Sequence, residues 1–251
     1  MMEEPQKSPP VPHTKRKGLR FPRLFLLSFI PFLVFSLGFI PVILTIRLVL
    51  YYTTFERFTH LVFLPFLIVF ELLLLFVSEL LISGGIIRMF RIRYQEGTYE
   101  YSVRDKNAFK WMLLCQLYTP MRKALEIIPM GGLQRTYLRL LGMKIGKNTL
   151  VGGVIKDPCL TEFGSDTTMG EYAILYAHIH NYEKHTITFT KTKVGNSCII
   201  GAGAILMPGV TLQDHAVVAA GAVVPKNRVL EQEKIYAGNP ATEITPVKKT
   251  N

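Results

Sequence analysis

The sequence has few cysteines and few acidic residues. Its 251 residues include three cysteines, which are too few and too scattered for a disulfide framework or a zinc cluster, and which fit a reducing compartment. Against 18 Asp and Glu stand 29 Lys and Arg, which gives a net charge of +11. Such a charge can indicate nucleic-acid binding. Many of the basic residues flank apolar segments, however, where anionic headgroups account for them, so we expect no nucleic-acid partner.

Charge is absent from a long N-terminal segment. No charged residue occurs in the range 24–46, which is long enough for a helix to cross a hydrocarbon core of about 30 Å. A second apolar run, 61–87, is interrupted by Glu71 and Glu79 alone. We predict that residues 23–93 form a two-helix transmembrane hairpin in the lipid bilayer. Because a carboxylate facing lipid is costly, Glu71 is expected to face protein or a polar cavity.

Basic residues cluster on one side of the predicted hairpin. The loop between the two spans carries only Arg47 and Arg57, the latter beside Glu56. The bias of Lys and Arg toward the cytoplasmic side therefore predicts an integral protein of the cytoplasmic membrane, with both termini and the catalytic domain in the cytoplasm. Residues 1–22 are expected to be a disordered basic tail. The flanking basic residues are Lys15, Arg16, Lys17, Arg20, Arg23, Arg88, Arg91 and Arg93.

The second half of the chain repeats with a period of six. Small or compact residues follow four positions after most of the repeated aliphatic residues, as at Cys198, Ala204 and Ala216. Three short strands per turn of a triangular solenoid give this period, whereas an α-helix or a hairpin meander does not. We predict a mainly β fold, a left-handed parallel β-helix over 144–230. The repeated residues are Val194, Ile200, Leu206, Leu212, Val218 and Val224, with an earlier set at Ile145, Val151, Phe163, Met169 and Leu175.

One segment breaks the repeat. Residues 181–193 span two hexads plus one residue, and insertions in a solenoid become loops that often lie on the binding face. His178, His180 and His185, three of the chain's six histidines, lie in or beside the break. Leu175 and Ile179 take the inward slots of their hexad, so His178 and His180 are expected to point out of the core. This coincidence is the main indication of chemistry.

The remaining segments connect or end these parts. Residues 94–143 are expected to be a helical connector with Trp111, the only tryptophan, on its first helix. Basic amphipathic helices beside a membrane span commonly lie on the interface, and a cap over the open end of the solenoid is an equally good interpretation. Residues 231–251 are expected to be a C-terminal tail.

Two late motifs resemble the hexapeptide-repeat acyltransferase superfamily. The sequence around Gly209 resembles its M-P-G-V-x-I turn, and Tyr236 to Ala241 resembles its Y-x-G-N-P-A signature. Upstream, 140–146, 157–162 and 179–183 resemble the membrane-bound C-terminal domains of ε-poly-lysine-type peptide synthetases. The resemblance implies a homotrimer that binds acetyl-CoA, or another acyl-CoA, between adjacent solenoids. It also implies direct acyl transfer to a hydroxyl or amine, with a histidine as the general base.

The resemblance leaves two candidates for this base. In the synthetase-type domains a histidine stands before an aromatic–acidic pair, as His180 stands before Tyr182 and Glu183, whereas sugar O-acetyltransferases align their base nearer His178. We prefer His180 as the base. Glu183 is a candidate for orienting its imidazole, although a solvated loop carboxylate is the plain alternative. His185 is interpreted as a loop residue.

The resemblance also implies where CoA binds. The pantetheine of family members runs along backbone amides of the late coils, and a basic residue meets the nucleotide phosphates. Lys226 and Arg228 lie where that basic residue is expected, although a solvated corner is the plain alternative for both. The amides carried over from the family are those of Gly201, Ala202, Gly203, Ala219, Ala220 and Gly221.

Three functions are therefore weighed. The first is an integral-membrane O- or N-acyltransferase that moves an acyl group, expected to be acetyl, from CoA to a membrane-associated acceptor such as a lipid-linked glycan. The second is a metal site of the γ-carbonic anhydrase type, for which the spacing of His180 and His185 resembles one ligand pair. The third ligand of that type is missing, because no histidine lies between His60 and His178. We expect no metal. The third is a non-catalytic membrane scaffold, which would neither bind nor hydrolyse acetyl-CoA.

Overall fold

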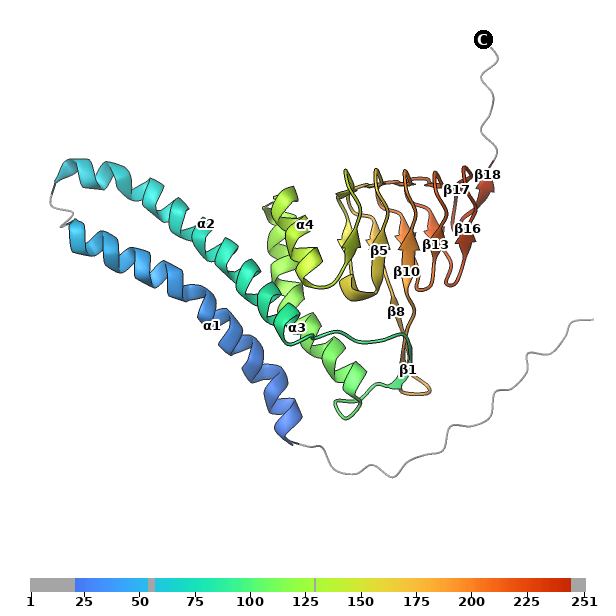
Figure 1. Cartoon of the computed structure of the whole chain (residues 1–251), viewed down its shortest axis with the longest axis horizontal. Helices are drawn as coiled ribbons and strands as arrows, with labels where there is room; N and C mark the ends of the chain where they lie inside the picture. The colour runs from blue at the N-terminus through green and yellow to red at the C-terminus, as the bar shows by residue number, and fades with distance from the viewer. Residues whose placement is uncertain (1–20, 54–56, 129, 245–251) are drawn as a thin grey trace, which may run out of the picture.

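The computed structural model describes residues 21–53, 57–128 and 130–244 (Figure 1). The tail expected at 1–22 lies outside these residues except for Phe21 and Pro22, which belong to the first helix. The basic positions from Lys15 to Arg20 also lie outside them.

Two long helices form an antiparallel pair. Helix α1 spans Phe21–Tyr52 and helix α2 spans Phe58–Met89. By length and composition both are able to cross a membrane. Most of their large apolar side chains are exposed, for example Phe32 and Phe63 at 68% each. In Figure 1 the pair projects away from the rest of the chain.

Polar side chains of the two helices turn toward each other. Glu71 is buried, and its Oε2 accepts a hydrogen bond of 2.8 Å from Oγ1 of Thr45. Ser78 donates to the carbonyl oxygen of Gly38 at 2.7 Å. A Cβ atom at Gly38 would lie 2.3 Å from the carboxyl carbon of Glu79, so glycine makes room for that side chain. Glu71 therefore faces the neighbouring helix, as its cost against lipid led us to expect.

A connector lies between the helix pair and the β-helix (Figure 1). It contains strand β1 (Gly97–Glu100) and helices α3 (Lys106–Ile127) and α4 (Gly131–Leu140). Oδ1 of Asp105 accepts hydrogen bonds from the amides of Asn107 and Ala108, which caps the N-terminus of α3. The connector buries Leu114 and Leu117 completely.

The connector also covers the first coil of the β-helix. Arg139 of α4 donates to the carbonyl oxygen of Ile145 at 2.8 Å, and Arg135 donates to that of Gly146. The Tyr118 hydroxyl of α3 donates to the carbonyl oxygen of Ile155 at 2.7 Å. These bonds satisfy backbone groups that an uncovered coil would leave unpaired. Within the described residues the connector therefore covers the first coil of the solenoid, and its position on the membrane interface stays a prediction.

Short parallel strands build the three faces of the β-helix. The sheet orders are β16-β13-β10-β5-β2, β17-β14-β11-β6-β3 with β18 added antiparallel to β17, and β15-β12-β7-β4. The predicted parallel β-helix is therefore confirmed. The strands are β2 (Lys144–Ile145), β3 (Leu150–Val151), β4 (Val154–Ile155), β5 (Thr161–Phe163), β6 (Thr168–Met169), β7 (Ile174–Leu175), β10 (Thr192–Val194), β11 (Ile199–Ile200), β12 (Ile205–Leu206), β13 (Thr211–Leu212), β14 (Val217–Val218), β15 (Val223–Val224), β16 (Val229–Leu230), β17 (Ile235–Ala237) and β18 (Thr242–Ile244).

The six-residue period stacks its aliphatic residues inside. Leu206 is paired with Leu175 on one side and Val224 on the other, and all three are 0% exposed. Cys198 fills one of the small-residue slots and is also 0% exposed. The strands continue past residue 230 to Ile244, so the last part of the β-helix lies within the segment that the sequence suggested as a tail.

The break in the repeat is an antiparallel hairpin. Strands β8 (His178–Asn181) and β9 (Thr186–Phe189) pair with each other, and β9 pairs with β1 of the connector. The insertion therefore projects from the β-helix and joins it to the segment that follows the helix pair.

Candidate active site

A buried carboxylate holds one of the two candidate histidines. Oδ2 of Asp157 lies 2.7 Å from Nδ1 of His178. Asp157 is 0% exposed, whereas the His178 side chain is 15% exposed. Because an ionised carboxylate can only accept, Nδ1 of His178 carries the proton in this bond. The Nε2 atom of the neutral ring then presents a lone pair, and no other described residue bonds it.

Three elements hold Asp157 in place. It precedes the 3₁₀ helix η1 (Pro158–Leu160), which follows β4 in the first coil. Its Oδ2 also accepts from the amide of Ala177 at 2.8 Å, and its Oδ1 accepts from the Tyr94 hydroxyl at 2.6 Å. Burial, reinforced by the charge of Asp157, raises the pKa of Tyr94 well above its ordinary value, so Tyr94 remains a donor. The carboxylate is therefore fully engaged, and His178 receives a fixed orientation.

Aromatic rings surround His180 instead of a carboxylate. Its ring centre lies 4.7 Å from that of Tyr101, 5.3 Å from that of Trp111 and 5.7 Å from that of Tyr182, on which it stacks. Trp111 also lies 5.0 Å from His178, and the two imidazoles are 5.5 Å apart. We call Tyr101, Trp111 and Tyr182, together with the two histidines, the aromatic cluster.

Two polar atoms of the aromatic cluster have no partner. Nδ1 of His180 and Nε1 of Trp111 are buried and make no hydrogen bond among the described residues. Burial, with a smaller contribution from the neighbouring His178, holds the pKa of His180 below its usual 6.5. His180 is therefore a neutral imidazole at neutral pH, next to an indole donor that is free to bond a ligand.

Glu183 lies in the loop that follows His180, as does His185, which the sequence predicted to be a loop residue. Glu183 and His185 are exposed in the turn between β8 and β9, and no hydrogen bond joins Glu183 to either imidazole among the described residues. His185 has a positive φ of 49°, and its carbonyl oxygen accepts from the amide of Tyr101. The orienting carboxylate comes from Asp157, twenty-one positions before the histidine.

The predicted CoA-binding residues form stacked corners of the late coils. Gly203 and Gly221 have positive φ values of 68° and 69°, and their Cα positions are open to solvent. The carbonyl oxygen of Ala202 accepts from the amide of Gly221, which ties one corner to the next. Ala202 and Ala220 are exposed residues, and their amides donate no hydrogen bond within the described residues. Gly201 and Ala219 are partly buried and bond the next coil instead.

Lys226 and Arg228 lie on an exposed corner after β15. No carboxylate of the described residues forms an ion pair with either side chain. Both cations therefore remain available to an anionic ligand.

A metal centre finds no support in the described residues. No group of three or more His, Cys, Asp or Glu side chains there is placed to hold a metal ion. His185 lies in the exposed turn. The carboxylate nearest to His178 is that of Asp157, which already accepts hydrogen bonds from Tyr94, Ala177 and His178.

The comparisons with known proteins agree with this architecture. Residues 191–226 match the family profile described as "Bacterial transferase hexapeptide (six repeats)". This part of the β-helix, from β10 to the corner after β15, therefore carries the hexapeptide repeat that the profile describes. The "Putative acetyltransferase YvoF" of Bacillus subtilis (strain 168) is 35% identical over 112 residues, which are 43% of this chain and 61% of that protein.

Other similarities are more distant. The "Delta-poly-L-ornithine synthetase" of Acinetobacter baumannii is 24% identical over 163 residues, 64% of this chain and 12% of that protein. A maltose O-acetyltransferase structure from Clostridium difficile 630 aligns with a TM-score of 0.44 and 19% identity, over 59% of this chain and 91% of that one. "Gamma carbonic anhydrase 2, mitochondrial" of Arabidopsis thaliana is 28% identical over 97 residues, 39% of this chain and 28% of that protein. The chain thus covers less than two thirds of each of these curated relatives.

Proposed function

We propose that this protein is a membrane-anchored acyltransferase that moves an acetyl group from CoA to a hydroxyl or amine of a membrane-associated acceptor. The observation that carries the proposal is the hydrogen bond from Nδ1 of His178 to the buried carboxylate of Asp157. A histidine fixed in this way presents Nε2 in a fixed direction, as a general base requires. The sequence favours His180 for this role, but the hydrogen bonds favour His178, and we assign the base to His178.

The transfer then proceeds without a covalent enzyme intermediate. Nε2 of His178 removes the proton from the acceptor as its oxygen or nitrogen attacks the thioester carbonyl. The new C–O or C–N bond forms and the C–S bond breaks, and the imidazolium returns the proton to the CoA thiolate. The negative charge of Asp157 stabilises the imidazolium while it exists.

Cysteine chemistry is a poor alternative in this region. Cys115 and Cys159 are the thiols near Asp157, and burial raises their pKa values to about 12 and about 11. Since the thiolate is the nucleophile, neither side chain is suited to form an acyl-enzyme at neutral pH.

The exposed corners of the late coils suit pantetheine. The free amides of Ala202 and Ala220 belong to adjacent coils, which are about 4.8 Å apart in stacked strands. They would donate to the amide carbonyl groups of pantetheine, and Lys226 and Arg228 would bind the nucleotide phosphates as unpaired cations. The solenoids of a homotrimer would supply the opposite wall of this groove, as the family resemblance implies.

The aromatic cluster suits the acceptor. It places flat apolar faces beside two unbonded polar atoms, Nδ1 of His180 and Nε1 of Trp111. A ring that carries hydroxyl groups, such as the sugar of a lipid-linked glycan, could pack on the faces and bond these atoms. The helix pair would hold the protein at the bilayer where such an acceptor resides. The basic flanks favour an orientation with the β-helix in the cytoplasm, where it would meet acyl-CoA.

The test uses the purified full chain in detergent, radiolabelled acetyl-CoA and a total membrane lipid extract. We expect label to enter the organic phase with the native protein and to fall to background with His178→Ala, while both proteins bind CoA equally. CoA binding without any transfer to lipid would remove the membrane acceptor from the proposal. Absence of CoA binding would favour the scaffold function.

A further inference from the structure

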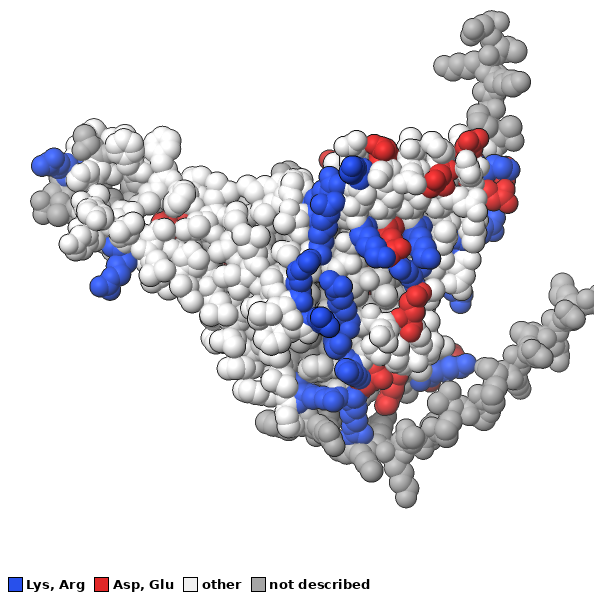
Figure 2. All heavy atoms as spheres, viewed as in Figure 1, with Lys and Arg blue, Asp and Glu red and all other residues white. Residues whose placement is uncertain are grey.

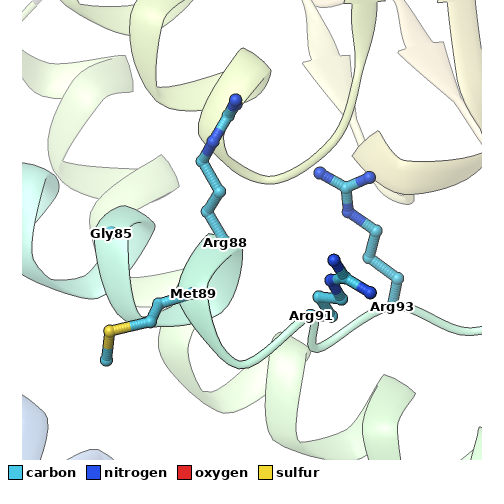
Figure 3. Close-up of a pocket in the computed structure, with 5 residues that line it drawn as sticks. All are labelled: Gly85, Arg88, Met89, Arg91 and Arg93. Atoms are coloured by element: carbon cyan, nitrogen blue, oxygen red, sulfur yellow. The ribbon is translucent and has the colours of Figure 1, made fainter.

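A cluster of three arginines lies where the helix pair meets the connector. Arg88, Arg91 and Arg93 line an open pocket of about 580 Å³ together with Gly85 and Met89. In Figure 3 the side chains of Arg88 and Arg93 extend to the same side, with Arg91 between them and Met89 pointing away. Figure 2 shows basic side chains gathered in a band at this boundary. We call the three residues the arginine cluster.

The arginine cluster has no anionic partner. All three side chains are exposed, and no carboxylate of the described residues forms an ion pair with any of them. Three adjacent guanidinium groups repel one another unless an anion lies between them. Guanidinium groups bind phosphate oxygens through charge-assisted, often bidentate hydrogen bonds, so a phosphate group fits this arrangement.

Arg91 has a backbone conformation that arginine rarely adopts. The amide of Ile92 donates to the carbonyl oxygen of Ile87 at 3.0 Å, and the amide of Arg91 donates to the carbonyl oxygen of Arg88 at 3.3 Å. These are the two hydrogen bonds of a Schellman motif, which ends α2. Arg91 takes the left-handed position of this motif, with φ of 49°, where glycine is usual. An arginine here costs the fold roughly 1 kcal/mol relative to glycine. A ligand that needs the guanidinium would account for that cost.

Arg93 is held by its surroundings. A Cβ atom at Gly142 would lie 2.7 Å from Nε of Arg93, so the side chain lies directly over this glycine. Gly142 has a positive φ of 104°, a conformation that other residues rarely adopt. Arg93 therefore occupies the space that a side chain at position 142, just before β2, would fill.

The surroundings of the arginine cluster are apolar on the side of the helix pair. Met89 and Phe90 are 68% and 66% exposed. They lie at the end of α2, whose outer surface is apolar along its length. A ligand with a phosphate on the arginines and a hydrocarbon chain along these residues would satisfy both surfaces, whereas a soluble phosphate would satisfy only one.

We propose that the arginine cluster binds the phosphate of a membrane lipid whose acyl chain lies along the C-terminal end of α2. The same extended segment carries Tyr94, which bonds Asp157, so the lipid would sit beside the residues that position His178. Lipid binding does not require acyl transfer, and the proposal stands or falls independently of the proposed function.

Binding is measured with the detergent-solubilised full chain and dioctanoyl phosphatidylglycerol as the probe. Replacement of Arg88, Arg91 and Arg93 together by Gln should weaken binding by about tenfold or more, since it removes the charged donors that bond the phosphate oxygens. The matched control removes Arg47 and Arg57, at the other end of the helix pair, and should leave binding unchanged. His178→Ala should also leave it unchanged.

Arg91→Gly separates binding from folding. Because glycine is preferred at this position, the variant should melt at the same or a higher temperature and yet bind the lipid more weakly. Equal weakening by the Arg47 and Arg57 control would show diffuse attraction in place of a site and overturn the proposal. Unchanged binding in the triple variant, or equally tight binding of inorganic pyrophosphate, would overturn it as well.

Discussion

Asp157 and His178, which are twenty-one positions apart in the sequence, are joined by a hydrogen bond of 2.7 Å between Oδ2 and Nδ1. The carboxylate is fully buried and the imidazole is partly exposed. Only the first coil, the hairpin and the connector together produce this arrangement, because Tyr94 and Ala177 bond the same carboxylate. This relationship is the reason for which we propose His178, and not His180, as the general base.

Asp157→Asn should lower turnover by roughly 10²-fold or more, since the amide can offer its NH₂ group to Nδ1 and favour the wrong tautomer. The KM for acetyl-CoA should not change, because Asp157 acts through His178 and not on the cofactor. Steady-state kinetics on the purified variant measure both quantities. Asp166→Asn, on an exposed corner, is the matched control and should be fully active. A variant of Asp157 that keeps full turnover would show that the carboxylate has no role in positioning the base.

Acidification should destabilise the fold through His180. Its pKa is lower in the folded protein than the ordinary 6.5, chiefly because of burial. Below pH 6.5 the unfolded chain therefore binds more protons at this residue, and the stability that the neutral ring provides is lost as the pH falls. Melting temperatures between pH 7.5 and pH 5 should decline less steeply for His180→Gln than for the native protein. The exposed His185→Gln should follow the native curve, and identical slopes for all three would contradict the assignment.

Close stacking of the coils should make a substitution of Gly146 destabilising. A Cβ atom at Gly146 would lie 2.4 Å from the backbone of Gly164 in the next coil, so Gly146→Ala should cost about 1–3 kcal/mol. Gly132→Ala, in α4 with open space around it, should be neutral or stabilising by up to about 1 kcal/mol. Thermal denaturation of both variants provides the comparison. Equal melting temperatures of the two variants would mean that the coils can move apart to accept a methyl group without a loss of stability.

Cysteine labelling tests the proposed topology. Tyr52 is 75% exposed at the end of α1, and a cysteine there should react with an impermeant maleimide from outside intact cells, because the basic flanks lie on the other side. A cysteine at Gln232, on an exposed corner of the β-helix, should react only after the cells are opened. The reverse pattern would place the β-helix away from cytoplasmic acyl-CoA.

The repeat predicted the β-helix because burial at every sixth residue is a local property of the sequence. Val194 and Leu212, for example, are read directly from the spacing and are both buried. The carboxylate was missed although a signal was present. Asp157 stands six residues after Val151, where the repeat requires an aliphatic residue, but Ile155 takes the inward slot and the chain turns into η1.

The aromatic cluster could not be predicted in this way. Trp111 comes from α3 and Tyr101 precedes that helix, and they reach the histidines only because β1 pairs with β9. Such contacts depend on how the connector packs against the hairpin, which no periodicity encodes. The choice between His178 and His180 depended on the same packing, since both point out of the core in a strand.

The most direct test of the account compares two alanine variants in one transfer assay. His178→Ala should lower turnover by roughly 10²–10⁴-fold, the usual contribution of general acid–base catalysis, with CoA affinity unchanged. His180→Ala should retain most of the turnover and mainly raise the KM for the acceptor, because we place it in the acceptor site. If His180→Ala abolishes transfer while His178→Ala is fully active, the base is His180 and the Asp157–His178 pair is only structural.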